Sequence, residues 1–155
     1  MTYSYQKARR AEGDAIFNLY CLVMRSSVSQ IWGWDEQWQK NDFSTHFDPQ
    51  DITLVCRGRE LIGYSHVEDR GEQLFLRMIV VHPHYQRRGI GSRLLESVIN
   101  SGKEQSRKIG LEVFKINSEA KKFYEGYGFT VEGDTPHSYV MGLMPDSLVD
   151  KNGSH

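Results

Sequence analysis

One junction, at residues 78–99, constrains this chain more than any other stretch. An apolar run at 78–81 and Pro83 precede a short segment rich in glycine and arginine, and residues 92–99 then repeat apolar side chains at helical spacing. The segment reads Gln86, Arg87, Arg88, Gly89, Ile90 and Gly91. A helix that starts there aims backbone N–H groups and the positive end of its dipole at one point, which suits a phosphate. The residues therefore predict a phosphate-binding turn, with an ordinary strand-to-helix turn as the alternative.

The two common nucleotide motifs do not match this turn. A dinucleotide fingerprint needs a third glycine, and Leu94 stands in its place. A P-loop ends in Gly-Lys-Ser/Thr, whereas residues 91–93 are Gly-Ser-Arg. A nucleotide-binding regulatory module is therefore the least favoured of the functions that a phosphate site allows.

A second segment lies downstream, far enough away for one helix and one strand between the two. It has a short apolar run at 110–114, then Asn117, Ala120 and Tyr124, and it ends at Gly128 and Phe129. Together the two segments resemble the GNAT superfamily of acetyltransferases. The first is similar to the acyl-CoA loop of that superfamily, Gln/Arg-x-x-Gly-x-Gly/Ala, and the second to its strand, Asn and Gly-Phe helix motif. The resemblance covers roughly residues 74–131.

The hydrophobic pattern predicts a mixed α/β fold. We expect strands at 3–7, 52–56, 61–68, 73–81, 109–114, 130–132 and 138–143, of which those between 52 and 81 form an antiparallel meander. We expect helices that open at Gly13, span 31–47 around Trp34 and Trp38, open at Gly91, and span 118–127 with Ser118 as the cap.

The resemblance implies a GNAT-like fold: a mostly antiparallel central sheet with a splayed pair of strands and helices on both faces. A chain of 155 residues has room for one core. We therefore expect a single acetyltransferase domain over residues 1–145, followed by a flexible tail at 146–155.

Composition disfavours several classes of partner. The chain carries 19 Lys and Arg against 20 Asp and Glu, so no basic excess points to nucleic acid. No apolar stretch approaches membrane-spanning length, and the N-terminus lacks the apolar region of a signal peptide. Cys21 and Cys56 have no Cys or His at metal-ligand spacing beside them, so we expect no metal. We expect a reduced, cytoplasmic protein.

The resemblance implies acetyl-CoA as co-substrate and assigns residues to it. The strand end would bind the pantetheine arm through its backbone, although core packing also explains Ile79, Val80 and Val81. Asn117 would bond the pantetheine or tie down the splayed strand, and a turn residue before a helix is the equal alternative. The remaining residues would hold the pyrophosphate, chiefly through backbone amides: Gln86, Arg87, Arg88, Gly89, Ile90, Gly91 and Ser92.

Tyr124 matches the family's general acid, which would lie against the co-substrate. A phenol can give its proton to a leaving thiolate because the two have comparable acidities. A core tyrosine with its hydroxyl at the surface is the alternative, and Tyr127 is the weaker candidate for the acid. The base is open: many relatives place a glutamate near Arg77, and arginine cannot accept a proton. Glu68, directly or through a water, and His66 are the candidates, and ordered water alone would also serve.

Residues 31–38 lie where this superfamily builds one wall of the acceptor pocket. On a helix, Trp34 and Trp38 would share a face. With Asp35 and Glu36 they would suit a cationic amine, through cation–π attraction and ion pairing. Alternatively, the tryptophans anchor the helix and the carboxylates sit in water at its start.

The leading function is therefore an acetyl-CoA-dependent N-acetyltransferase that moves acetyl directly to a primary amine of a small molecule, peptide or protein. The alternative is a non-catalytic domain that binds or senses acyl-CoA, since fold alone does not separate the two. Tyr124 favours the enzyme, because a pure binding domain has no need of the phenol. Exposed aromatics such as Trp32 would suit a homodimer interface, and dimers are common among relatives.

Overall fold

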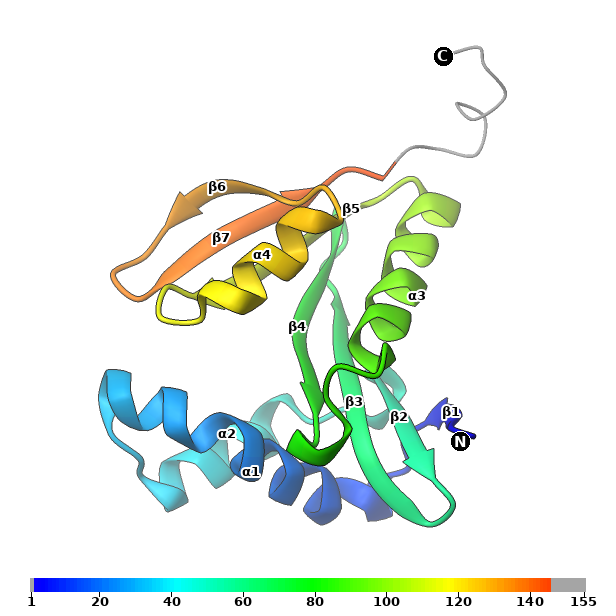
Figure 1. Ribbon diagram of the computed structural model, residues 1–155, viewed down its shortest axis with the longest axis vertical. Coiled ribbons are helices and arrows are strands. Elements are labelled where there is room, and N and C mark those ends of the chain that lie inside the picture. The colour runs from blue at the N-terminus through cyan, green and yellow to red at the C-terminus, as the bar shows by residue number, and fades with distance from the viewer. Residues whose placement is uncertain (1, 146–155) are drawn as a thin grey trace. The chain divides into compact units, whose positions relative to one another are not determined.

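The computed structural model describes residues 2–145, whose strands form one seven-stranded sheet (Figure 1). The strands are β1 (Ser4–Lys7), β2 (Ile52–Arg57), β3 (Glu60–Asp69), β4 (Gln73–Val81), β5 (Lys108–Phe114), β6 (Thr130–Asp134) and β7 (Ser138–Leu143). Their order in the sheet is β1-β2-β3-β4-β5-β7-β6. The pair β4–β5 is parallel, whereas β1–β2, β2–β3, β5–β7 and β6–β7 are antiparallel. The expected mixed, mostly antiparallel sheet is confirmed.

Helices connect most of these strands. The α-helices are α1 (Gly13–Trp32), α2 (Glu36–His46), α3 (Ile90–Gln105) and α4 (Ser118–Gly126). Short 3-10 turns are η1 (Arg10–Glu12), η2 (Pro49–Asp51) and η3 (Pro83–Tyr85). Within residues 2–145, no helix combines the length and the apolar character that crossing a membrane requires.

The helix expected over residues 31–47 is wrong at its start. Helix α1 runs to Trp32 and ends at Gly33, whose φ of 82° is a conformation that glycine adopts without strain. Helix α2 begins only at Glu36, because Asp35 caps it: the Asp35 carboxylate accepts the N–H of Trp38 at 2.9 Å. Trp34 therefore lies in the connection before α2 and does not share a helical face with Trp38.

The chain divides into two compact units. The first comprises residues 2–66 and 78–94, and the second comprises 67–77 and 95–145. Strands β3 and β4 and helix α3 each contribute to both units. The expected tail at 146–155 lies outside the described residues, and the single domain over 1–145 stays a prediction.

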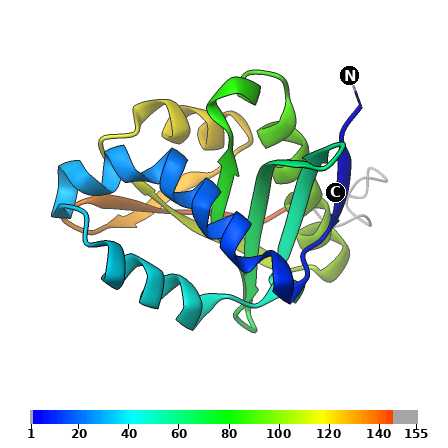
Figure 2. The same cartoon turned by 90° about the horizontal axis from the view of Figure 1, so that it is seen from below.

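In the first unit, β2 packs on both of its faces. Leu54 belongs to the same buried cluster as Ile16 of α1. Its neighbour Val55 points to the opposite face and joins a cluster with Ile90 at the start of α3. Helix α1 and the first turn of α3 therefore cover opposite faces of the strands, as the resemblance implied. Helices α1 and α2 lie side by side (Figure 2), where Tyr20 of α1 donates to Gln39 of α2 at 2.8 Å.

In the second unit, β5 pairs with the β6–β7 hairpin. Strands β5 and β7 pair from Ile109 opposite Leu143 to Phe114 opposite Ser138. Helix α4 connects β5 to β6, and its cap is one residue earlier than predicted. The Oδ1 of Asn117, and not the Ser118 hydroxyl, accepts the N–H of Ala120, at 3.1 Å.

Candidate active site

Hydrogen bonds fix the segment between β4 and α3 in the first unit. The N–H of His82 donates to the carbonyl of Ile62 at 2.8 Å, and Nδ1 of His82 accepts the N–H of His84 at 3.0 Å. The Nε2 of Gln86 then donates to the carbonyl of Val81 at 3.0 Å. The first residue of the predicted phosphate loop is thereby tied to the end of the strand that precedes it.

The loop backbone contains two residues with positive φ. Arg87 and Gly89 have φ values of 64° and 80°, in the left-handed region that few residues other than glycine adopt. Helix α3 begins when the N–H of Arg93 donates to the carbonyl of Gly89 at 3.0 Å. The amides of residues 90–92 precede that bond and have no acceptor within the helix. They point, with the helix dipole, at the exposed loop of residues 86–89.

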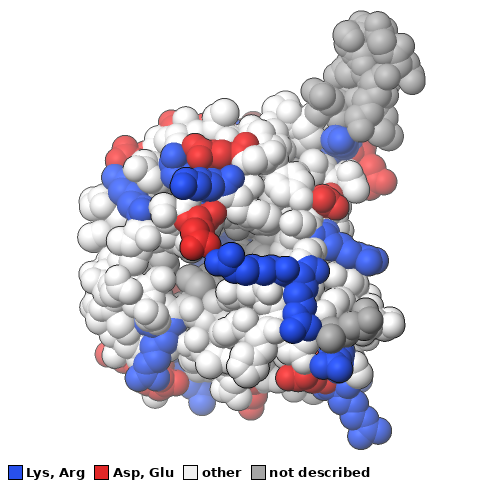
Figure 3. Space-filling view, in the orientation of Figure 1, with Lys and Arg blue, Asp and Glu red and all other residues white. Residues whose placement is uncertain are grey.

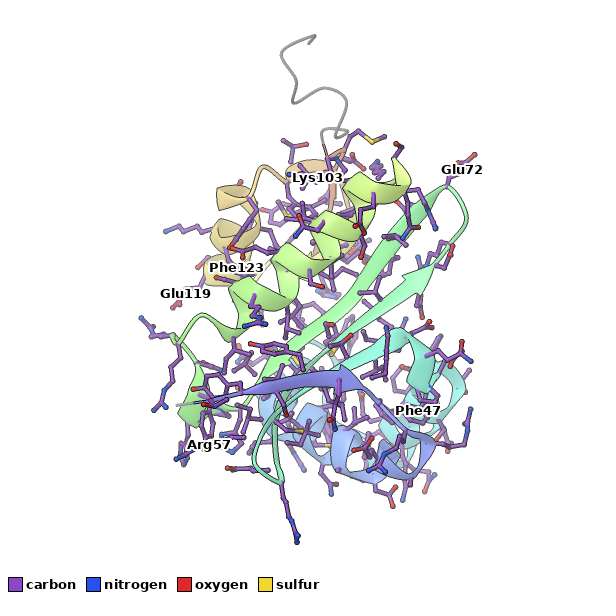
Figure 4. All side chains as sticks on the ribbon, turned by 90° about the vertical axis from the view of Figure 1, so that its right-hand side faces the viewer. Phe47, Arg57, Glu72, Lys103, Glu119 and Phe123 are labelled. Atoms are coloured by element: carbon purple, nitrogen blue, oxygen red, sulfur yellow. The ribbon has the colours of Figure 1, made fainter. Side chains whose placement is uncertain are left out.

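The loop also leaves room for a ligand and carries positive charge. A Cβ added to Gly89 would meet no heavy atom of the protein within 4 Å. The Arg88 guanidinium lies 5.2 Å from the centroid of the Tyr85 ring. The hydroxyl of that buried tyrosine accepts from Arg57 and donates to Glu60, each at 3.1 Å (Arg57 is labelled in Figure 4). Figure 3 shows Lys and Arg side chains over the part of the face where this loop lies in Figure 1.

The end of β4 offers its backbone and not its side chains. Val80 is fully buried, and the half-buried Ile79 and Val81 pack against the cluster beneath α3. Pairing of β4 with β5 covers Gln73–Leu76 opposite Lys108–Leu111, and β4 then continues to Val81. Core packing therefore accounts for the three side chains, which leaves backbone groups as the part of this segment that a ligand would use.

In the second unit, Tyr124 sits in an aromatic surrounding near the end of α4. Its half-buried ring lies 5.3 Å from the centroid of Phe123 and 5.7 Å from that of Phe129. Burial raises the pKa of the Tyr124 phenol to about 12. Within residues 2–145 the hydroxyl makes no side-chain hydrogen bond, so its proton is held at neutral pH and is not committed to a neighbour.

Two other residues of this motif have partners of their own. The Oδ1 of Asn117 is the cap of α4, which leaves the exposed Nδ2 for a ligand. The hydroxyl of Tyr127 donates to the Glu96 carboxylate at 2.7 Å. A donor already bound to a carboxylate is less available to a thiolate, so the geometry ranks Tyr127 below Tyr124 as the acid.

Glu68 lies between two arginines, also in the second unit. Its Oε1 accepts from Nη2 of Arg70 at 2.8 Å, and its Oε2 lies 3.7 Å from Nη1 of Arg77. The guanidinium of Arg77 therefore lies beside the carboxylate of Glu68. The other candidate base, His66, is a buried residue of the first unit opposite Ile52.

The aromatic segment of the first unit is held by local contacts. The Nε1 of Trp34 donates to Oε1 of Glu36 at 2.9 Å, while Asp35 is the cap of α2. The Arg25 guanidinium lies 5.3 Å from the Trp34 ring centroid. Trp38 is 58% exposed, so it does not anchor α2 to a core. Asp35 and Glu36 therefore lie at the start of a helix, as the alternative interpretation expected. Trp34 and Glu36 nevertheless form a pair of an aromatic ring and a carboxylate.

Each of the two units thus contains its own subset of the predicted site residues. The first unit holds the strand end, the loop and the aromatic segment, and the second holds Asn117 and Tyr124 on one helix and Glu68 in its ion pairs. Sequence reasoning missed Arg25, whose contact with Trp34 depends on the turn that ends α1. It gave no role to Tyr85, whose hydrogen bonds to Arg57 and Glu60 join residues far apart in the sequence.

Comparison with known proteins places the chain in a family. Residues 14–129 match the family described as "Acetyltransferase (GNAT) family", and the chain belongs to that family. Within residues 2–145, no group of His, Cys, Asp and Glu side chains is arranged to hold a metal ion.

The similar proteins are named as N-acetyltransferases. Spermidine N(1)-acetyltransferase of Escherichia coli (strain K12) is 25% identical over 150 residues, which cover 87% of this chain and 78% of that protein. PaiA N-acetyltransferase from Thermoplasma acidophilum, solved in complex with coenzyme A, has a TM-score of 0.76 at 18% identity, covering 93% of this chain and 99% of that one. Ribosomal-protein-S18-alanine N-acetyltransferase from Escherichia coli has a TM-score of 0.73 at 19% identity, covering 95% and 96%. The two solved structures share the fold.

Proposed function

We propose that the protein transfers acetyl directly from acetyl-CoA to a primary amine of a small molecule, peptide or protein. The observation that carries this proposal is the Tyr124 phenol. Its pKa is raised to about 12 by burial, and its hydroxyl has no side-chain partner within residues 2–145. The resemblance to the family gives it the role of general acid. A group that keeps its proton, and has no other use for it, is suited to protonate a leaving thiolate.

The loop before α3 fits the pyrophosphate of acetyl-CoA. The first amides of α3, from Ile90 to Ser92, would donate to the phosphate oxygens, and Gly89 leaves the approach open. Arg87 and Arg88 would add charge, and Gln86 holds the loop to β4. The backbone of residues 79–81 would bind the pantetheine arm, and Nδ2 of Asn117 would add one donor to it.

Acetyl transfer would form a C–N bond and break the C–S bond at the thioester carbonyl carbon. The amine nitrogen attacks the thioester carbonyl carbon, and the carbonyl oxygen takes up negative charge that backbone N–H groups at the end of β4 would stabilise. The C–S bond then breaks, the sulfur leaves with the electron pair, and Tyr124 gives it a proton. The proton lost by the amine passes to a base, and solvent restores the phenol. Acetylated amine and coenzyme A are the products.

We assign the base to Glu68, acting directly or through a water. The arginines beside it favour the charged carboxylate, which can accept a proton, but they also compete for its oxygens. Glu68→Gln keeps an oxygen for Arg70 and removes the site of protonation. We expect kcat/KM for the acceptor to fall at least about tenfold, from the usual worth of a general base. An unchanged value would leave the work to His66 or to ordered water.

We assign the acceptor side to the aromatic segment of the first unit. Trp34, Asp35, Glu36 and Trp38 would form a wall for a cationic amine, and the similarity to a spermidine acetyltransferase supports an amine of that class. Asp35 is engaged as a helix cap, so its contribution would be charge at a distance. A homodimer and a cytoplasmic location stay predictions.

The competing function, an acyl-CoA-binding domain without activity, is separated from the enzyme by two measurements. Thermal-shift binding of acetyl-CoA tests the loop, and thiol release against polyamines, amino acids, aminoglycosides and peptide N-termini tests the chemistry. Stabilisation with thiol release for one amine class supports the transferase. Stabilisation without release for any amine supports the binding domain, and no stabilisation contradicts both.

A further inference from the structure

The indole of Trp34 and the carboxylate of Glu36 form the kind of site that binds an alkylammonium group, and an arginine of the chain already lies in it. Trp34 Nε1 donates to Glu36 Oε1 at 2.9 Å. The Cζ of Arg25 lies 5.3 Å from the Trp34 ring centroid, within the range of a cation–π contact. Its Nη1 lies 3.8 Å from the same Glu36 oxygen. We propose that Arg25 is an internal occupant that a cationic amine must displace before it can bind to Trp34 and Glu36.

The two groups that would hold the ammonium are fixed by their surroundings. The ring of Tyr20 lies 6.1 Å from that of Trp34, and its hydroxyl donates to Oε1 of the buried Gln39 at 2.8 Å. Helix α2 begins at Glu36 itself, so the backbone of that residue is set by the helix. The aromatic face and the carboxylate are therefore in place without Arg25, and only the arginine would have to move.

Arg25 is held weakly enough to be displaced. Its side chain is 61% exposed and that of Glu36 is 62% exposed, and contacts of these two kinds contribute little at such exposure. Removing the guanidinium while keeping the site should therefore tighten the binding of an external ammonium by about three- to tenfold. The affinity of the site formed by Trp34 and Glu36 for a cation would therefore depend on Arg25 as much as on Trp34. The inference rests on the proposed function only for the view that the bound amine is an acceptor.

Binding is best followed at Trp34 itself. The chain has 3 tryptophans, so the double change Trp32→Phe and Trp38→Phe leaves Trp34 as the only one, and its fluorescence reports on the site. Spermidine is the probe, titrated without acetyl-CoA. Arg25→Met removes the charge and keeps an unbranched side chain. Arg59→Ala, an exposed residue of the β2–β3 hairpin in the same unit, is the control for losing one positive charge.

We expect the Kd of spermidine to fall about three- to tenfold in Arg25→Met, to stay unchanged in Arg59→Ala, and to return to its original value when Glu36→Gln is added to Arg25→Met. Arg25→Lys, which keeps the charge, should behave as the parent and shows that the position tolerates change. Binding no tighter in Arg25→Met than in Arg59→Ala overturns the inference, and so does a gain that survives Glu36→Gln. Because acetyl-CoA is absent, a failure of acetyl transfer is a separate result.

Discussion

Replacing Tyr124 by phenylalanine isolates the hydroxyl from the ring. The ring contacts with Phe123 and Phe129, at 5.3 and 5.7 Å, are kept, and the hydroxyl has no side-chain hydrogen bond to lose within residues 2–145. We therefore expect the fold to be as stable as before at neutral pH. We expect kcat to fall about 10²- to 10⁴-fold, the usual worth of a general acid, while KM for acetyl-CoA stays within about twofold.

The size of this effect follows from the surroundings of the phenol. Burial raises the pKa of Tyr124 from 10.0 to about 12, so the phenol keeps its proton at neutral pH and would be available as the proposed acid. Losing the proton donor then costs ~3–5 kcal/mol of the barrier, which is the rate factor of 10²–10⁴ expressed as free energy.

The pH dependence of stability gives an independent check. The phenol titrates at 10.0 when unfolded and at about 12 when folded, so its contribution to stability is fully present below pH 10 and is lost between pH 10 and about 12. For a pKa raised this far, the complete loss of stability is ~3 kcal/mol. Tyr124→Phe lacks the titrating group, so its stability should not show this loss. Urea denaturation of both proteins at about pH 9 and about pH 11 measures roughly half of this loss, on the order of 1 kcal/mol, because about pH 11 lies midway between the two pKa values.

Initial rates of thiol release from acetyl-CoA, with the best amine of the panel, measure the catalytic effect. Tyr127→Phe is the matched control: it removes a hydroxyl from the same segment, one that donates to Glu96, and it should leave kcat unchanged. Equal kcat for the parent and Tyr124→Phe, with an unchanged melting temperature, would remove Tyr124 from the mechanism.

Three further changes test the loop, the sheet and an ion pair. Gly89→Ala places a Cβ in space that the protein leaves open, at a φ of 80°, so KM for acetyl-CoA should rise about tenfold with kcat little changed; an unchanged KM in steady-state kinetics would contradict phosphate binding there. Gly63→Ala places a Cβ 2.9 Å from the carbonyl oxygen of Val80, so the free energy of unfolding, measured by urea denaturation, should fall by about 1–3 kcal/mol. An unchanged free energy would show that β3 and β4 can move apart at little energetic cost. The hydrogen bond from the Arg107 guanidinium lowers the pKa of Asp69 from 3.8 to about 2, so the stability from this carboxylate is present above pH 3.8 and is lost as the pH falls toward 2. In Asp69→Asn the melting temperature should therefore depend less on pH over that range. A pH dependence equal to that of the parent would contradict the pairing.

The fold was largely readable because its signals are local. Alternating apolar residues predicted the strands from 52 to 81, and glycine with arginine predicted the turn before α3. The boundary between α1 and α2 was not readable from the tryptophans, because aromatic spacing looks the same in a helix and in a connection. Two small residues set the boundary: Gly33 leaves the helical conformation at the end of α1, and Asp35 caps α2.

The candidate site was readable only where a motif encoded it. The loop and Tyr124 could be proposed because the spacing of their motifs along the chain is fixed, whereas contacts between distant residues left no pattern. Arg77 meets Glu68 across a strand connection, and Arg57 reaches Tyr85 over 28 positions in the chain. Such pairs depend on strand register and side-chain direction, which neither residue's type reveals alone.

In the proposed mechanism, two groups of the second unit with opposite surroundings would share the proton transfers. Tyr124 stands among aromatic rings, where a charge is costly, so it is held neutral and able to donate. Glu68 stands between two guanidinium groups, 2.8 Å from Arg70 and 3.7 Å from Arg77, and would be the acceptor of the amine's proton. A pair of titratable groups whose surroundings act in opposite directions is the arrangement by which enzymes separate an acid from a base at one pH. Double replacement, Tyr124→Phe with Glu68→Gln, should then lower kcat by about the product of the single effects if each group serves its own proton transfer. An effect no larger than that of Tyr124→Phe alone would assign the amine's proton to another acceptor.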